Sequence, residues 1–183
     1  MIKKEDRRRN VVSLLSNPSG PISKGIIMSR TIVIKPHHFL DVIKLYGKGI
    51  EVFVPDKKYN HDFYKIGNNI LNNKNIIFVL TLGCDDICKP CIFLKNGKCI
   101  DKIKNHGSYT SKEEFNRLID TRLLNQLGLK EGKEITTLEF CSIMKNRLNI
   151  FEIWKEEPKE KVAERQKNLL LGLEKYMNEP KNF

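Results

Sequence analysis

Apolar residues recur along the chain with two periods, one typical of buried strands and one typical of amphipathic helices. Short apolar or β-branched runs predict strands at residues 31–35, 51–54 and 75–82. Apolar positions spaced by three or four residues predict helices, which cover residues 37–49, 61–73, 111–128, 136–148 and 158–177. Strands alternate with helices early and helices dominate late. The sequence therefore predicts an α+β fold with a small mixed sheet and a helical C-terminal part.

Local signals predict the ends of two of these helices. Ser111 and Glu114 have the spacing of an N-terminal capping box, and Gly128 is placed to end the same helix. The last helix is too short for a confident coiled coil, so we expect it to dock on the domain through one apolar face. That face carries Val162, Leu169, Leu173 and Tyr176.

Composition divides the chain into three segments. Residues 1–28 combine charged residues with closely spaced turn signals and predict a basic, weakly ordered extension. Residues 29–150 contain every cysteine and predict a metal-binding domain. Residues 151–183 are predicted to form the C-terminal helix.

Charge and hydropathy limit the classes of partner. The formal net charge is +11, from 33 basic and 22 acidic residues. Residues 1–30 hold seven basic and two acidic residues, which leaves 26 basic against 20 acidic over the rest. Because no basic stripe interleaved with aromatics accompanies this excess, nucleic acid is a weakly supported partner. The sequence shows no long apolar run and no signal-peptide core, so we expect a soluble, cytoplasmic protein with no membrane partner.

The most informative feature is a cluster of cysteines. Cys84, Cys88, Cys91 and Cys99 lie within sixteen residues, whereas Cys141 stands alone on an apolar helix face. In a reducing cytoplasm such a cluster indicates a metal or redox site rather than a disulfide framework. We interpret Cys141 as a buried, inert thiol.

A turn signal predicts how the last cysteine returns to the others. Asn96-Gly97 lies between two short apolar stretches and is the strongest sequence signal for a two-residue hairpin turn. That turn would pair Leu94 with Cys99. Cys99 would then lie about 10 Å along the strand from Cys91, at ~3.3 Å per residue.

Four clustered thiols can close either a tetrahedral zinc site or a cubane iron–sulfur cluster. Zinc sites usually combine two tight cysteine pairs, and only one is present here. Ile87, Ile92 and Phe93 would give a cluster a dry shell, while Asp85 and Asp86 would lower its potential. The spacing therefore favours 4Fe–4S and leaves zinc as the alternative. Radical S-adenosylmethionine enzymes share the spacing of the first three cysteines, but the mostly helical sequence that follows does not fit their barrels.

A second constellation is the stretch "KPHHFLD". His37 and His38 point to different sides of a helix, so at most one of them is expected to face the cysteines. Asp41 follows His38 by three residues and can share its face. These three are our candidate catalytic residues, and the alternative is that a histidine caps the helix or fills a polar gap.

Together, "RTIVIKPHHFLDVIKLYGKG" and "DDICKPC…NGKC" resemble a small uncharacterised bacterial and archaeal family expected to bind an iron–sulfur cluster. The likeness covers residues 30 to about 130. It implies that the last three cysteines of the cluster are ligands, and that His37 and His38 have a functional role.

The chain departs from the family pattern near both motifs. Asp41 stands where the family tends to place a cysteine, and Cys84 is an additional cysteine. A minor departure is Ile92, which stands in place of a proline. Either Cys84 is the fourth ligand or Asp41 binds one iron, and cysteine is the better ligand for iron in such a cluster.

We therefore predict one 4Fe–4S cluster that serves electron transfer or redox sensing with an unidentified redox partner or small molecule. Its predicted ligands are Cys84, Cys88, Cys91 and Cys99. Two alternatives stay open. One is a cluster-dependent enzyme with a substrate pocket lined by His37, His38 and Asp41, and the other is a structural zinc module.

Overall fold

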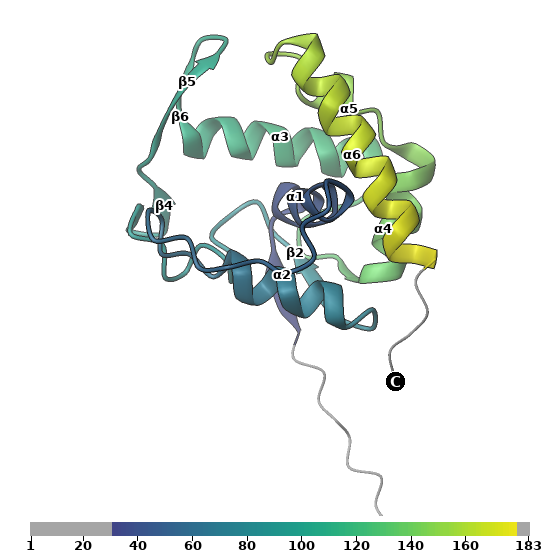
Figure 1. The fold of residues 1–183 in the computed structure, drawn as a ribbon. Coiled ribbons are helices and arrows are strands. Elements are labelled where there is room, and N and C mark those ends of the chain that lie inside the picture. The colour runs from purple at the N-terminus through teal and green to yellow at the C-terminus, as the bar shows by residue number, and fades with distance from the viewer. Residues whose placement is uncertain (1–30, 179–183) are drawn as a thin grey trace, which may run out of the picture.

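The computed structural model describes residues 31–178, and these residues form an α+β fold (Figure 1), as the hydrophobic pattern predicts. The predicted N-terminal extension lies outside the described residues. In chain order, the elements are β1 (Ile32–Ile34), α1 (Pro36–Gly47), α2 (Phe63–Asn72), β2 (Ile77–Leu80), β3 (Leu94–Lys95), β4 (Lys98–Cys99), β5 (Lys102–His106), β6 (Tyr109–Ser111), α3 (Lys112–Leu127), β7 (Glu134–Thr136), α4 (Thr137–Arg147), α5 (Ile150–Ile153) and α6 (Lys159–Asn178).

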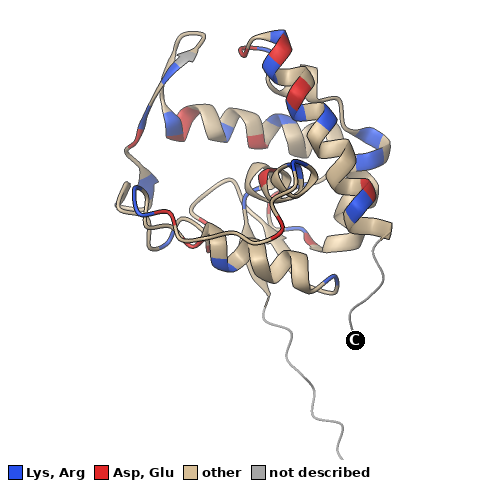
Figure 2. Ribbon diagram, in the orientation of Figure 1, with Lys and Arg blue, Asp and Glu red and all other residues tan. Residues whose placement is uncertain are grey.

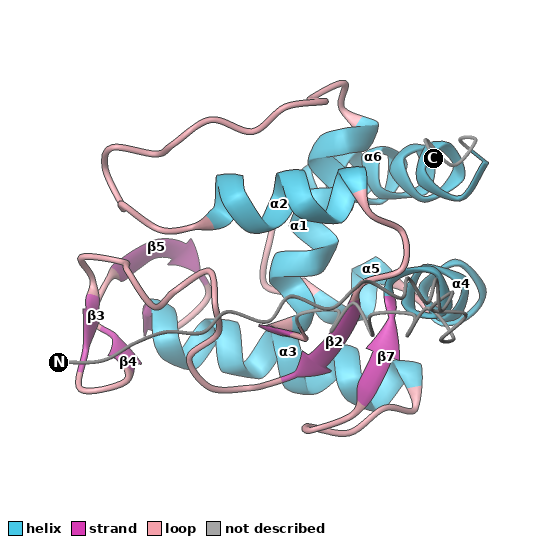
Figure 3. Ribbon diagram, turned by 90° about the horizontal axis from the view of Figure 1, so that it is seen from below, coloured by secondary structure: helices cyan, strands magenta, loops and turns pink. Residues whose placement is uncertain are grey.

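A three-stranded sheet with order β1-β2-β7 lies at the centre of the core (Figure 3). β1 runs parallel to β2, and β7 pairs antiparallel with the other edge of β2. Phe39 of α1 packs on the sheet and on α4, with ring centroids 5.1 Å from Phe78 and 5.0 Å from Phe140. Alternate residues of the short strands are buried, which fits a sheet whose two faces differ in exposure.

Helix α1 starts directly after β1 and is surrounded by other elements (Figure 1). Pro36 is its first residue, where a missing backbone N–H costs nothing. Helix α6 packs along α1, so the prediction that the last helix docks on the domain is confirmed. No helix in residues 31–178 is both long and apolar enough to cross a bilayer.

The predicted strand at residues 51–54 is wrong. This segment has no regular secondary structure, bends at residue 52, and pairs with no strand of the described structure. The side chain of Asn68 makes the backbone hydrogen bonds that a paired strand would otherwise make to Phe53. Its Oδ1 accepts a hydrogen bond from Phe53 N at 2.8 Å, and its Nδ2 donates to Phe53 O at 2.9 Å. The β-branched residues around Phe53 therefore belong to a long connection between α1 and α2.

Local signals for α3 and the hairpin are confirmed. Ser111 Oγ accepts a hydrogen bond from Glu114 N at 3.3 Å, and Gly128 adopts a left-handed conformation where α3 ends. Asn96 and Gly97 both have positive φ, as the two-residue turn requires. The hydrophobic pattern did not predict β5, β6, β7 or the short α5.

Basic and acidic side chains are interspersed over the helices of the described residues rather than collected on one element (Figure 2). This distribution gives no structural support for a nucleic-acid face, so that partner stays a weakly supported prediction.

Candidate metal centre and adjoining cavity

The four clustered cysteines lie on one irregular segment between β2 and β5. Cys84, Cys88, Cys91 and Cys99 are half-buried free thiols. The predicted hairpin register is present, because Leu94 pairs with Cys99 across β3 and β4. The hairpin places Cys99 opposite Leu94, whose N donates to Cys91 O at 3.0 Å. Among the described residues, the ligand atoms of the four cysteines do not form a group within 4.8 Å of one another.

Backbone hydrogen bonds give this segment a fixed course. Cys91 N donates to Cys88 O at 2.9 Å, and Cys88 N donates to Asp85 Oδ1 at 2.9 Å. At the hairpin, the carboxylate of Glu113 accepts a hydrogen bond from Cys99 N at 3.0 Å. The carboxylates of Asp85 and Glu113 thus position the backbones of Cys88 and Cys99, respectively.

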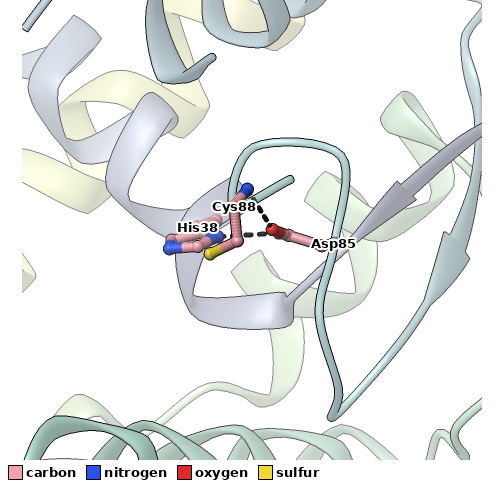
Figure 4. Close-up of side chains that lie close together, drawn as sticks. All are labelled: His38, Asp85 and Cys88. Carbon is pink, nitrogen blue, oxygen red and sulfur yellow. Dashed lines mark hydrogen bonds and ion pairs between the residues drawn. The ribbon is translucent and has the colours of Figure 1, made fainter. Parts of the chain in front are cut away.

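Asp85 is the side chain that joins the cysteine segment to the start of α1 (Figure 4). It is completely buried, and its Oδ2 accepts hydrogen bonds from Lys35 N at 3.0 Å and from His38 Nδ1 at 2.7 Å. Ligand atoms of His38, Asp85 and Cys88 all lie within 4.8 Å of one another. This proximity of imidazole, carboxylate and thiol is compatible with metal binding.

The electrostatics of this group favour an ionised carboxylate and protonated thiols. Burial opposes ionisation of Asp85, but the charge and hydrogen bond of His38 and two backbone N–H groups hold the pKa of that carboxyl well below its usual range. Burial raises the pKa of Cys88, and the nearby Asp85 raises it further. Burial also raises the pKa of Cys84. A metal that binds these thiols must therefore displace their protons.

A buried cation lies beside the same group. Lys35 is 3% exposed, and its amine is close to Asp85, Cys88 and Glu113. Burial by itself would lower the pKa of Lys35, but the surrounding negative groups outweigh that effect and raise it. Lys35 thus stays charged and supplies a positive field next to the cysteine segment.

His37 makes a second pairing of histidine with aspartate, with Asp120 of α3. Its backbone N donates to Asp120 Oδ1 at 2.8 Å, and its Nδ1 lies 2.7 Å from Asp120 Oδ2. The rings of His37 and His38 have centroids 4.2 Å apart. Only His38 contacts the cysteine segment, as expected for adjacent residues on a helix.

The three candidate catalytic residues line one cavity of about 500 Å³ next to the cysteine segment. His37 and His38 form part of its wall, and Asp41 lies farther along α1. Asp41 is paired with Lys44 and with Arg165, whose Nη1 is 3.5 Å away. Burial opposes the ionisation of Asp41, but these two cations outweigh it and lower its pKa.

Other residues of the site were not identified from the sequence. Asp120 is fully buried within α3, and the signal for it is a carboxylate among the apolar residues Ile119, Leu123 and Leu124. Such a position requires a buried partner, and His37 provides it. Lys35 gave no comparable signal, because its burial depends on packing between segments distant in sequence.

The matches with known proteins concern the cysteine segment and its surroundings. Residues 56–157 match the model of a family described as "Protein of unknown function (DUF1284)". The matched range includes all four clustered cysteines and extends through α5. The chain matches no curated protein and no solved structure.

Proposed function

We propose that this chain, which belongs to the DUF1284 family of proteins of unknown function, binds one iron–sulfur cluster for electron transfer or redox sensing. The observation that carries the proposal is the pairing of Leu94 with Cys99, which places Cys99 opposite a residue that is hydrogen-bonded to Cys91. The ligands would be Cys84, Cys88, Cys91 and Cys99, and the cluster would be of the 4Fe–4S type.

The surroundings of the cysteines fit such a group. All four thiols are free and half-buried, so they combine access for a cofactor with partial exclusion of water. The buried amine of Lys35 offsets the negative charge that thiolate ligands introduce. Bound there, a cluster would supply one-electron transfer, and the protein would set its potential through charge, hydrogen bonds and burial.

Cys84 is a better candidate than Asp41 for the fourth ligand. Asp41 Oδ1 is already bound by Lys44 and approached by Arg165 of α6. Cys84, by contrast, is a half-buried free thiol whose Sγ lies 3.7 Å from the Asp85 carbonyl oxygen. Cys84 is therefore available to a cluster, whereas Asp41 is held by cations of two helices.

Zinc is the second candidate, and the proximity of His38, Asp85 and Cys88 favours it. Against it, Asp85 already accepts hydrogen bonds from Lys35 N, His38 Nδ1 and Cys88 N. A zinc ion bound to this carboxylate would have to displace contacts that position α1 and the cysteine turn. We therefore interpret Asp85 as a positioning residue and favour the cluster.

The test is to purify the protein without oxygen, record its absorption spectrum, and measure iron, acid-labile sulfide and zinc per chain. A brown protein with about four irons and four sulfides supports the proposal. A colourless protein with about one zinc would replace it with a structural metal site.

The choice of the fourth ligand needs a matched pair of variants. Cys84→Ser is expected to lose most of its iron, whereas Asp41→Ala is expected to keep it. Circular dichroism of both variants shows whether each is folded. Iron retained in Cys84→Ser and lost in folded Asp41→Ala would reverse the assignment.

A further inference from the structure

The cavity beside the cysteine segment has the size and composition of a small-molecule site. Its volume of about 500 Å³ lies within the ~300–1,000 Å³ typical of such sites. Side chains of α1, of the connection between α1 and α2, and of the first turn of α3 line it. None of the clustered cysteines lines it, so a molecule bound there would not need to be a metal ligand.

One wall of the cavity is apolar and open to solvent. Val52 and Val54 are 71% and 75% exposed, and Ile50 beside them is 37% exposed. All three line the cavity from a segment that no strand covers. An apolar ligand would shield these side chains from water, which gives their exposure a physical reason.

Aromatic rings continue this wall. Phe53 and Phe63 meet edge to face with centroids 5.2 Å apart, while Tyr59 and His61 stack nearly parallel at 5.5 Å. The amine of Lys112 lies 4.5 Å from the centre of the Tyr59 ring. Flat ring faces and edges are the surfaces on which a planar ligand packs best.

The polar part of the cavity includes the imidazole rings of His37, His38 and His61. His37 and His38 use Nδ1 to contact Asp120 and Asp85, and only 9% and 15% of their side chains are exposed. Nε2 of each ring therefore remains for a partner other than these two carboxylates. It accepts a hydrogen bond when the ring is neutral and donates one when the ring is protonated. Figure 4 shows this second nitrogen of His38 on the side away from Asp85.

A further polar atom of the wall lacks a protein partner. His61 Nδ1 is buried and has no hydrogen-bond partner among the described residues. A buried polar atom of this kind costs stability unless something satisfies it. A bound molecule with a polar group next to His61 Nδ1 would provide the missing hydrogen bond.

The charges around the cavity argue for a neutral ligand. Lys44 is paired with Asp41, and Lys112 Nζ lies 2.9 Å from Asp101 Oδ2. Each of these cations is therefore already compensated by a carboxylate. An anionic ligand would have to compete for them, whereas a neutral one would not.

We propose that this cavity binds a neutral, planar aromatic molecule whose hydroxyl group forms a hydrogen bond with Nε2 of His37 or His38. The cavity wall is joined to the cysteine segment, because Ile92 N donates to Tyr59 O and Asp62 N donates to Ile87 O, both at 3.0 Å. These bonds connect the cavity wall to the residue before Cys88 and to the residue after Cys91. The binding itself does not depend on which metal the cysteines hold.

The probe is 2-naphthol, and its control is 2-methoxynaphthalene, which keeps the rings and lacks the donor. We expect calorimetry to give a Kd on the order of 0.1 mM for the naphthol and about tenfold weaker binding for the ether. The anion 2-naphthoate should also bind more weakly. Equal affinity for 2-naphthol and its methyl ether would show that the hydroxyl group makes no hydrogen bond in the cavity. Tighter binding of 2-naphthoate would show that the cavity prefers an anion to a neutral ligand.

The four histidines provide an internal control for the position of the probe. In ¹⁵N spectra of the imidazoles, 2-naphthol should shift Nε2 of His37 or His38 and leave His106 unchanged, because His106 is not part of the cavity wall. A shift of all four or of none would overturn the proposal.

A pair of surface variants tests the apolar wall without disturbing a buried group. Val54→Ser should weaken naphthol binding about threefold, and Leu170→Ser, at a 48% exposed position on α6, should not change it. Equal effects would place the probe elsewhere. Iron, sulfide and zinc are measured on the same samples, so failure of the cluster proposal and failure of this one are separate results.

Discussion

Gly172 of α6 lies directly against the backbone of Ile43 in α1. A Cβ atom added at Gly172 would be 2.0 Å from the Ile43 carbonyl oxygen and 3.0 Å from the backbone nitrogen of Gly47. Gly47 is close to α6 in the same way, since a Cβ there would be 1.9 Å from the carbonyl oxygen of Asn168. The two helices therefore approach through glycines, and this approach holds α6 beside the helix that carries the histidines.

We expect Gly172→Ala to destabilise the protein although alanine favours helices. Relief of the contact with Ile43 requires α1 and α6 to separate, and such overpacking costs about 1–3 kcal/mol, against a gain of about 1 kcal/mol in helix propensity. Urea unfolding measures the difference. Glu174→Ala, at an exposed position of the same helix, is the control, and equal stability of both variants would contradict the interpretation.

Asp85→Asn should both destabilise the fold and reduce metal content. The amide cannot provide acceptors for Lys35 N, Cys88 N and His38 Nδ1 together, and loss of charge-assisted bonds at a buried site costs about 2–4 kcal/mol. Urea unfolding and iron per chain are the measurements.

Asp86→Asn is the matched control for this variant. Its carboxylate accepts a single described backbone hydrogen bond, from Val33 N at 2.9 Å, and pairs with the exposed Lys89. Its effect on stability and iron should be smaller. A larger loss in Asp86→Asn would show that Asp85 is not the main link between α1 and the cysteines.

The pairing of Glu156 with Arg122 makes stability depend on pH at acid values. Arg122 Nη1 and Nη2 each lie 2.7 Å from a carboxylate oxygen of Glu156, and these hydrogen bonds lower the pKa of Glu156 from its ordinary 4.5. The unfolded chain binds the proton more readily, so the stabilisation is complete above pH 4.5 and is lost as the pH falls below it.

Glu156→Gln should therefore lower stability at pH 7 and flatten its decrease between pH 5 and 3, as thermal unfolding over this range would measure. Glu164→Gln removes a solvent-exposed partner of Lys48 and is the control. If the stability of the wild type and that of Glu156→Gln fell in parallel with pH, the Glu156–Arg122 pair would not be the cause of the loss of stability at acid pH.

Cys141 should behave differently from the clustered thiols. It is completely buried on α4, and burial raises its pKa to about 12. At pH 8 its thiolate fraction is on the order of 10⁻⁴, so a disulfide reagent should modify it only after unfolding. Ellman titration of native and unfolded protein measures this, and Cys141→Ala should keep its full metal content.

Rapid labelling of five thiols in the native, metal-free protein would contradict the buried position of Cys141. Loss of iron in Cys141→Ala with unchanged circular dichroism would instead make it part of the metal site.

The sequence by itself determined the elements whose signals are local. The turn at Asn96-Gly97, the cap at Ser111 and the end of α3 at Gly128 depend on φ angles and hydrogen bonds within a few residues. The spacing of the four cysteines is also a local property, and so is the helical rotation between His37 and His38, which lets them contact different aspartates. Each of these features could be predicted because no distant segment is needed to specify it.

Only the tertiary structure decided which groups meet across the chain. The partnership of His38 with Asp85 and that of His37 with Asp120 join residues 47 and 83 positions apart. The segment around Phe53 looks like a strand, but the side chain of Asn68 satisfies its backbone and leaves it as the wall of a cavity. Periodicity reports which positions are apolar, whereas burial of a carboxylate or an amine depends on a partner that arrives from elsewhere in the fold.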